Sequence, residues 1–324
     1  MRLRSLTVLL FLSFVSLHTL AQSQPAELKL SITPPFRFIA YGDTRFTNPS
    51  DTKAADPQAR LALVHAIADA KPAFISLGGD IAYDGNKQED WKVYDTETAK
   101  WSESGIAVFP ALGNHDLHGD QNVALTNYFA RYPQIKKSRY YAVRAGNVLM
   151  LTLDSNQEIS SGAQFDWLES QLGKVDPSVD FIVLVFHHPP YTSSSDDKKY
   201  GGGHSARSSE QKLAQYLEQR QKSMRARIVV FNGHVHNYEH HEHGGIHYFV
   251  TGGGGAHAYP VPREAGDLFK SDEINYHYIE VLVEKGKLTT TMHRVQLING
   301  KEIWTTPDRV TISVSEALAN TAAK

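Results

Sequence analysis

Five short apolar segments of this sequence each end close to a side chain that can bind a metal ion. We expect these segments to be β-strands over residues 36–41, 73–77, 106–112, 181–186 and 228–231. The side chains at their ends are Asp43, Asp80, Asn114, His187 and His234. In open α/β sheets, ligands bind outside the carboxyl ends of the strands. The pattern therefore predicts that five residues far apart along the chain meet at one site.

Segments with helical periodicity alternate with these strands. We expect helices over residues 58–70, 88–102, 121–132, 163–172 and 209–222. Further strands are expected over residues 140–143, 148–153, 248–251, 276–283, 288–295 and 310–314. Strands that alternate with helices indicate an α/β fold, and no linker-like stretch divides the chain.

The first residues have the pattern of a secretory signal peptide. Arg2 and Arg4 precede an apolar run over residues 6–17, and small residues over 19–21 offer a cleavage site. An uncleaved membrane anchor is the alternative, but the run is short for a membrane span. We therefore expect a secreted or periplasmic protein without a membrane anchor after cleavage. The expected organisation is a signal peptide over 1–21, an N-terminal lead over 22–35, a catalytic domain over 36–315 and a tail over 316–324.

Composition limits the chemistry of any metal site. The chain of 324 residues has 16 histidines and no cysteine, which excludes disulfides, thiolate zinc sites and cysteine nucleophiles. A transition metal would need His, Asp, Glu, Asn or Tyr ligands. The 33 Lys and Arg residues nearly balance the 35 Asp and Glu residues, so no nucleic-acid-binding surface is indicated.

The five strand ends carry more potential ligands than one tetrahedral metal uses. Besides the five residues named above, the neighbouring positions offer Tyr83, His115 and His236. Two ions about 3.5–4 Å apart, sharing a carboxylate, would fit such a set and are used for in-line displacement at phosphorus.

These blocks resemble the calcineurin-like metallophosphoesterase superfamily, and most closely its purple acid phosphatase branch. The resemblance extends from about Phe36 to Tyr259. The common superfamily pattern begins Asp-x-His, whereas Arg45 stands at that third position, where the branch usually has Gly. Purple acid phosphatases supply a tyrosinate from Gly-Asp-x-x-Tyr, which Asp80 and Tyr83 match. The resemblance implies a four-layer α/β/β/α sandwich of two mixed sheets, with a di-metal site at the carboxyl ends of the strands.

The resemblance also implies the ligands of each metal. Asp43, Tyr83 and His236 would bind the first metal, and Asn114, His187 and His234 would bind the second, with Asp80 as the bridge. A tyrosinate favours Fe(III) in the first position, beside a divalent Fe, Zn or Mn. Tyr83 could instead be a packed aromatic residue. Aligning on Val-x-x-His would select His188 as a ligand; aligning on His-x-Pro-x-Tyr favours His187.

The implied reaction is hydrolysis of a phosphate ester by a metal-bound hydroxide. His115 would act as general acid or phosphate contact, and Asp116 would orient it or simply cap the turn. Arg45 would hold a phosphate oxygen or form a structural ion pair, and His204 would face the substrate. We expect an exported acid phosphomonoesterase. The alternatives are a phosphodiesterase or nucleotide hydrolase on the same site, or a metal-binding protein without catalytic activity.

Three further patterns receive structural interpretations. His240, His241 and His243 are expected in a solvated loop rather than in a third metal site. The glycines over residues 252–255 are expected to allow close packing beside the metal site rather than to bind phosphate. Trp91 and Trp101 are expected in the core.

Overall fold

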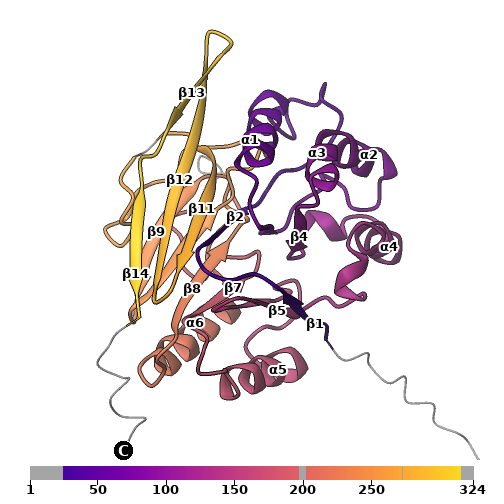
Figure 1. The fold of residues 1–324 in the computed structure, drawn as a ribbon. Coiled ribbons are helices and arrows are strands. Elements are labelled where there is room, and N and C mark those ends of the chain that lie inside the picture. Colours follow the sequence, from indigo (N-terminus) through magenta and orange to yellow (C-terminus); the bar gives the residue numbers. More distant parts are fainter. Residues whose placement is uncertain (1–24, 197–201, 272, 315–324) are drawn as a thin grey trace, which may run out of the picture.

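The computed structural model describes residues 25–196, 202–271 and 273–314 (Figure 1). The predicted signal peptide and the predicted tail lie outside the described residues. Within the described ranges, no helix is both long enough and apolar enough to cross a membrane.

The first of two seven-stranded mixed sheets has the order β1-β5-β6-β7-β8-β10-β9. Its strands are β1 (Glu27–Leu30), β5 (Tyr141–Ala145), β6 (Val148–Thr152), β7 (Phe181–Val185), β8 (Arg227–Asn232), β9 (Tyr238–His243) and β10 (Ile246–Thr251). Strands β6, β7 and β8 are parallel neighbours, so β7 and β8 end at the same edge.

The second sheet has the order β13-β12-β11-β2-β3-β4, and β14 also pairs with β12. Its strands are β2 (Phe36–Tyr41), β3 (Phe74–Leu77), β4 (Ala107–Pro110), β11 (Tyr276–Glu284), β12 (Lys287–Ile298), β13 (Lys301–Thr305) and β14 (Arg309–Ser313). Strands β2, β3 and β4 are parallel neighbours, so their carboxyl ends lie at the same edge of the sheet.

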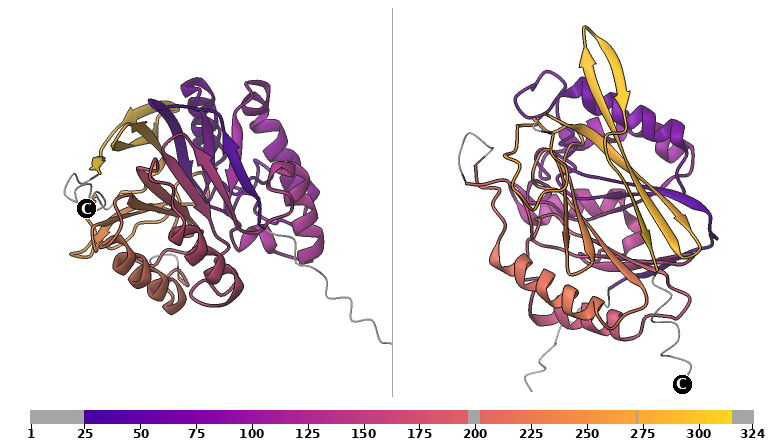
Figure 2. Two further views of the ribbon diagram at one scale, coloured as in Figure 1. Left: turned by 60° about the horizontal axis from the view of Figure 1, so that its bottom comes forward. Right: turned by 90° about the vertical axis from the view of Figure 1, so that its left-hand side faces the viewer.

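Helices cover both outer faces of the two sheets (Figures 1 and 2). The elements on the side of the second sheet are α1 (Pro57–Ala70), α2 (Gln88–Glu97), α3 (Ala99–Glu103), η1 (His115–Leu117), α4 (Gln121–Arg131) and η2 (Pro133–Ile135). Helices α5 (Gly162–Gly173) and α6 (Ser208–Gln221) cover the first sheet. The predicted α/β/β/α sandwich with two mixed sheets is confirmed.

Strand β7 shows why the sheets bury both faces. Val183 and Val185 belong to the core between the two sheets, whereas Ile182 and Leu184 belong to the core beneath α5 and α6. Successive side chains of a strand point to opposite faces, so a continuous apolar run suits a strand covered on both sides. The predicted core residues Trp91 and Trp101 are both buried.

Three strands were not expected from the sequence. Strand β1 lies within the predicted polar lead and pairs with β5, and the exposed β13 extends the second sheet. Strand β9 contains His240 and His241, both buried, so the expected solvated loop is wrong. It pairs antiparallel with β10 along its whole length, and this pairing satisfies its backbone although its side chains are polar.

The expected helix over residues 88–102 is two helices. Thr98 ends α2 with a non-helical backbone, and its hydroxyl donates to the carbonyl oxygen of Tyr94 (2.7 Å). Thr side chains compete in this way with helical hydrogen bonding. The break turns α3 so that the indole N–H of Trp101 reaches the carbonyl oxygen of Val64 on α1 (3.1 Å).

Candidate metal centre

The polar side chains that follow five strands converge where the two sheets meet. The backbone N–H of Asp43, after β2, donates to the carbonyl oxygen of Gly79, after β3 (2.9 Å). From the other sheet, the backbone N–H of His234 donates to Oδ2 of Asp43 (2.8 Å). The convergence predicted from the strand ends is thus present.

Three of these residues have a left-handed backbone. The φ angles of Asp43, Asp80 and His234 are 57°, 52° and 72°. Residues other than glycine rarely adopt this region, and strained conformations gather at functional sites, where the surrounding structure holds them. The turns at the ends of β2, β3 and β8 therefore direct these side chains into the site, and their left-handed backbone has a steric cost.

Glycines leave the room that the side chains need. A Cβ atom on Gly113 would lie 2.2 Å from Oδ1 of Asp80, and one on Gly233 would lie 2.4 Å from Oδ2 of Asp43. The later glycines are packed as closely, since a Cβ on Gly254 would lie 2.2 Å from the carbonyl oxygen of Gly42. The expectation that residues 252–255 pack tightly beside the site agrees with this geometry.

The first group of potential ligands is Asp43, Asp80 and His236, all buried, with one ligand atom of each within 4.8 Å of the others. Oδ1 of Asp43 lies 3.7 Å from Nε2 of His236, and neither atom has a hydrogen-bond partner. Nδ1 of His236 lies 2.9 Å from the carbonyl oxygen of His257, which accepts its hydrogen. The free lone pair of His236 is therefore on Nε2, beside the carboxylate.

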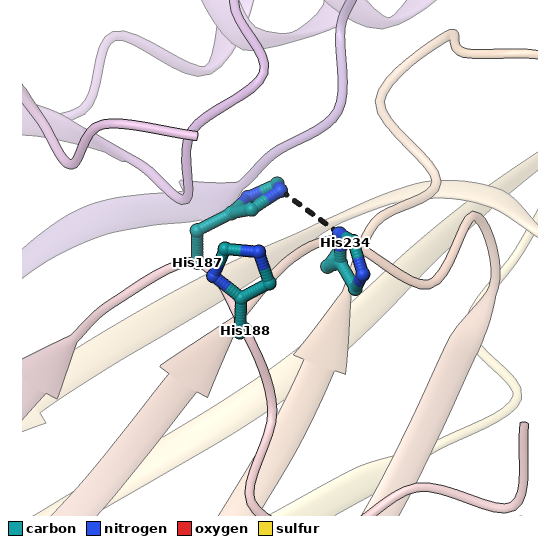
Figure 3. Close-up of side chains that lie close together, drawn as sticks. All are labelled: His187, His188 and His234. Carbon is teal, nitrogen blue, oxygen red and sulfur yellow. Dashed lines mark hydrogen bonds between the residues drawn. The ribbon is translucent and has the colours of Figure 1, made fainter. Parts of the chain in front are cut away.

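The second group surrounds Nε2 of His187. This atom lies 3.1 Å from Oδ1 of Asn114, 3.4 Å from Oδ1 of Asp80 and 3.3 Å from Nδ1 of His234. Nδ1 of His187 is 2.8 Å from the carbonyl oxygen of Gly78, so the hydrogen is on Nδ1 and the lone pair is on Nε2. Figure 3 shows the rings of His187 and His234 with the contact between them.

His188 lies next to this second group. Its ring is 4.4 Å from that of His234, and His187, His188 and His234 together have ligand atoms within 4.8 Å of one another (Figure 3). Its Nδ1 is 2.8 Å from the hydroxyl of Ser155. His187 is the histidine that faces Asp80 and Asn114, which favours it over His188 as a ligand.

The donor set fits two cations. In the first group, two unpartnered buried atoms with lone pairs face each other, and in the second, a ring lone pair faces two oxygen acceptors. Buried groups of this kind are costly unless they are hydrogen-bonded or bind a cation. Imidazole nitrogen and carboxylate or amide oxygen are ordinary ligands of Zn, Fe and Mn. Asp80 belongs to both groups and is placed to bridge them.

The electrostatics of the two carboxylates differ. Burial, followed by the charge of Asp80, raises the pKa of Asp43 well above its usual range. Burial also acts to raise the pKa of Asp80, but its interactions with His187, Arg45 and His115 hold that pKa well below its usual range. Asp80 is thus a carboxylate at neutral pH, and Asp43 is a carboxyl group whose ionised form needs a positive partner.

His115 lies at the entrance to this cluster. Its backbone N–H donates to Oδ1 of Asp80 (2.8 Å), and its Nδ1 lies 2.7 Å from the carbonyl oxygen of Tyr83. The rings of Tyr83 and His118 lie 5.4 and 4.0 Å from its ring, measured between centroids. Burial lowers the pKa of His115 to about 4. Its Nε2 points toward the metal ligands, 4.0 Å from Oδ2 of Asp80.

The hydrogen bonds of the Asp116 side chain are to backbone N–H groups. Its Oδ1 accepts the backbone N–H groups of Ile81 (2.8 Å) and Ala82 (3.2 Å), and its Oδ2 accepts that of Gly113 (2.8 Å). The carbonyl of Tyr83, not Asp116, holds the ring of His115. The geometry therefore supports the structural alternative, in which Asp116 ties the loops after β3 and β4 together.

His204 reaches the site from the loop before α6. Its ring lies 4.6 Å from that of His234 and 5.5 Å from that of His236. Its Nδ1 is buried without a hydrogen-bond partner, and burial lowers its pKa to about 4. Tyr259 lies beside it, at 5.3 Å between ring centroids, and its hydroxyl accepts the backbone N–H of His236 (3.2 Å).

A third group of potential ligands, Glu239, His241 and Asp267, lies in the interior beside β9. Its carboxylates already have partners. Asp267 accepts from Arg263 (2.7 Å), and Glu239 accepts from the hydroxyl of Thr192 (2.6 Å) and from the backbone N–H of Ser193 (2.6 Å). This group is a hydrogen-bonded network that holds the loop leaving β7.

Comparison with known proteins identifies the family. The model of the calcineurin-like phosphoesterases matches residues 36–238, which include the ends of all five strands. The chain belongs to the calcineurin-like phosphoesterase family. Among curated proteins, none matches the sequence.

Solved structures share the fold of this calcineurin-like phosphoesterase at low identity. A purple acid phosphatase from yellow lupin (Lupinus luteus) is 15% identical, with a TM-score of 0.66 over 87% of this chain and 54% of that one. The chain thus spans about half of the lupin protein. GAP50 of Plasmodium, titled the anchor in the inner membrane complex, is 19% identical, with a TM-score of 0.61 over 89% of this chain and 94% of that one. A dimetal phosphatase from Danio rerio is 14% identical, with a TM-score of 0.52 over 87% of this chain and 100% of that one.

The site of this calcineurin-like phosphoesterase contains residues that the sequence predicted and others that it did not. The structure brings together Asp43, Arg45, Asp80, Tyr83, Asn114, His115, His187, His204, His234 and His236. Tyr259 and the carbonyl oxygens of Gly78 and His257 were missed. Gly78 adjoins the Gly-Asp-x-x-Tyr motif, but a backbone carbonyl gives no signal of its own in a sequence, and His257 and Tyr259 follow the last motif.

Proposed function

We propose that this calcineurin-like phosphoesterase is a di-metal phosphomonoesterase. One observation carries the proposal: the lone pair on Nε2 of His187 faces oxygen atoms of both Asp80 and Asn114, within 3.4 Å. The lone pair and the two oxygens are all electron-rich, and a cation among them would interact favourably with all three.

Asp43, Tyr83 and His236 would hold the first ion, and Asn114, His187 and His234 would hold the second, with Asp80 shared. When bound, two such ions supply an activated water and neutralise the charge on the phosphoryl oxygens. We propose Fe(III) for the first position, because a tyrosinate is a hard anionic ligand, and a divalent Fe, Zn or Mn for the second. The ring of Tyr83 lies 5.4 Å from that of His115, measured between centroids, and so borders the cluster.

The remaining residues would bind the phosphate ester and protonate its leaving group. His115 is held at Nδ1, so its Nε2 is the atom that would carry a proton to the leaving oxygen. A bound phosphate raises the pKa of a neighbouring imidazole and so favours the protonated form. Arg45 and His204 would contact the phosphoryl oxygens, since both lie beside the proposed ligands.

The fold alone does not carry this proposal. The same architecture is found in two proteins titled phosphatases and in one titled an anchor, so function must be argued from the site. The buried ligands and the placement of His115 support hydrolysis. A phosphodiesterase on the same site is the second candidate from the sequence. Export through the signal peptide over residues 1–21 and an optimum at acid pH complete the proposal.

The test combines metal analysis with a comparison of two esters. The purified protein should contain close to two metal ions per chain and hydrolyse 4-nitrophenyl phosphate faster than bis(4-nitrophenyl) phosphate. A faster rate with the diester would indicate a phosphodiesterase. His187→Ala should lose metal and activity together, whereas His65→Ala, on the exposed face of α1, should change neither. A wild-type protein without bound metal or hydrolysis of either ester would refute the proposal.

A further inference from the structure

Arg45 combines three unusual features. It occupies the position where the superfamily pattern has a histidine. Its φ angle is 42°, in the left-handed region that an arginine rarely adopts. Its backbone is held on both sides, because its N–H donates to the carbonyl oxygen of Asp80 (3.0 Å) and its own carbonyl oxygen accepts Nη1 of Arg60 (3.2 Å). The chain thus keeps this side chain in place at a steric cost.

The guanidinium of Arg45 lies within the metal cluster. Its side chain is only 13% exposed, and its Nη2 lies 3.2 Å from Oδ2 of Asp80. Its Nε is buried without a hydrogen-bond partner. A guanidinium has five N–H donors, and a purely structural arginine usually has them paired.

Arg60 provides the internal comparison. It is also buried, but it binds Glu97 through two N–H groups (2.9 and 2.7 Å) and donates to the carbonyl oxygens of Arg45 and Thr47. All three side-chain nitrogens of Arg60 thus donate hydrogen bonds, as expected of a structural arginine. Arg45 lacks this pairing, and the ion pair that it makes among the described residues is with Asp80.

That carboxylate is the one shared by both metal positions. Oδ1 of Asp80 faces His187 in the second group and accepts the backbone N–H of His115 (2.8 Å). Oδ2 is the oxygen left for the first group, and Arg45 already lies on it. A cation in the first position and the guanidinium would therefore share one oxygen.

We propose that Arg45 is a built-in cation that competes with the first metal ion for Asp80 and makes the first position the weaker of the two. The inference rests on the proposed di-metal function. Like charges repel strongly over a few ångströms in a buried site, where water screens them poorly. We expect the second position to be affected less, because the guanidinium contacts Oδ2 of Asp80, whereas Oδ1 is the oxygen that faces His187 of the second group.

The test is a calorimetric titration of the metal-stripped full-length protein with Zn²⁺ at neutral pH, without substrate. We expect two binding events of unequal affinity in the wild type. Arg45→Gln and Arg45→Gly should tighten the weaker event by about tenfold or more, since each removes the competing charge. Arg45→Lys keeps a positive charge and should resemble the wild type. Glycine also suits the left-handed backbone, so folding of that variant should be retained.

The matched control is Arg37→Gln, which makes the same change of net charge at a side chain that is 53% exposed. It should leave both affinities unchanged. Binding of the weaker ion by Arg45→Gln at wild-type strength or less would overturn the inference and leave the proposed function intact. A wild-type protein that takes up no Zn²⁺ would overturn both.

Discussion

Oδ1 of Asp43 and Nε2 of His236 lie 3.7 Å apart, both buried and both without a hydrogen-bond partner. The two residues follow strands of different sheets. Each is fixed through its other polar atom: Oδ2 of Asp43 accepts the backbone N–H of His234, and Nδ1 of His236 is held by the carbonyl of His257. The two free atoms are thus positioned in advance for a shared cation, and this relationship leads to the first prediction.

Asp43→Asn should reduce the metal content from two ions per chain to one. In the metal-free protein, the same change should raise the melting temperature by roughly 2–4 °C, or about 1 kcal/mol. The reason is that burial and the nearby Asp80 raise the pKa of Asp43, so an ionised carboxylate is unfavourable there without a cation. Metal analysis and calorimetry test both parts. Asp69→Asn, on the exposed face of α1, serves as the control, and an unchanged metal content of two would contradict the prediction.

Tyr83→Phe should abolish a visible absorption band of the iron-loaded protein. A tyrosinate bound to Fe(III) gives a charge-transfer band, and phenylalanine cannot supply the oxygen. Tyr259→Phe is the matched control, because its ring also borders the site, next to His204. Absorption spectra of both variants test this prediction. Loss of the band in the Tyr259 variant alone would show that Tyr259, and not Tyr83, is the ligand.

His115→Ala should lower turnover by about 10²–10⁴-fold while both metal ions are retained. The loss should be larger for an alkyl phosphate than for 4-nitrophenyl phosphate, because a poor leaving group depends more on protonation. Steady-state kinetics with the two esters measure the difference. Equal losses for both esters would argue for a phosphate contact instead of a general acid.

Asp116→Asn should destabilise the protein by about 1–3 kcal/mol, because an amide cannot accept all three backbone N–H groups that the carboxylate accepts. Urea unfolding measures this cost. Turnover per folded molecule should fall much less than in His115→Ala. A loss of turnover as large as that of His115→Ala, at unchanged stability, would restore a catalytic role for Asp116.

His277→Gln should remove part of the loss of stability at acid pH. Burial lowers the pKa of His277 to about 4, and its ring nitrogens lie 2.9 Å from the carbonyl oxygen of Asn275 and 3.1 Å from the hydroxyl of Thr251. Between pH 6.5 and about 4 the unfolded chain binds a proton there and the folded chain does not. Wild-type stability should therefore fall by up to about 3 kcal/mol more than that of the variant across this window. Parallel curves of unfolding free energy against pH would contradict this.

The site could be predicted from the sequence to the extent that its residues belong to local patterns. Asp43, Asp80 and Asn114 each follow an apolar strand, and the carboxyl ends of neighbouring parallel strands necessarily meet. The partner of a side chain is not a local property. Asp116 turns toward the loop after β3 instead of toward His115, and this choice depends on which backbone N–H groups lack partners once both loops are in place.

The fold was least predictable where polar residues are buried. Strand β9 has the sequence Tyr-Glu-His-His-Glu-His, which has no apolar alternation, yet Glu239 and His241 are buried because they bind each other and the loop leaving β7. Strand β13 is exposed along most of its length and gives no signal of burial either. The periodicity of apolar residues therefore predicts buried strands only where the buried side chains are themselves apolar.

Each of the two proposed metal positions would take ligands from both sheets. Asp43, Asp80 and Asn114 come from the second sheet, and His187, His234 and His236 come from the first. Neither position exists until synthesis has passed residue 236 and the two halves of the sandwich have docked. Metal binding at either proposed position would thus be a late event in the folding of this chain. A chain exported in the unfolded state would therefore cross the membrane without its ions and take them from the compartment in which it folds.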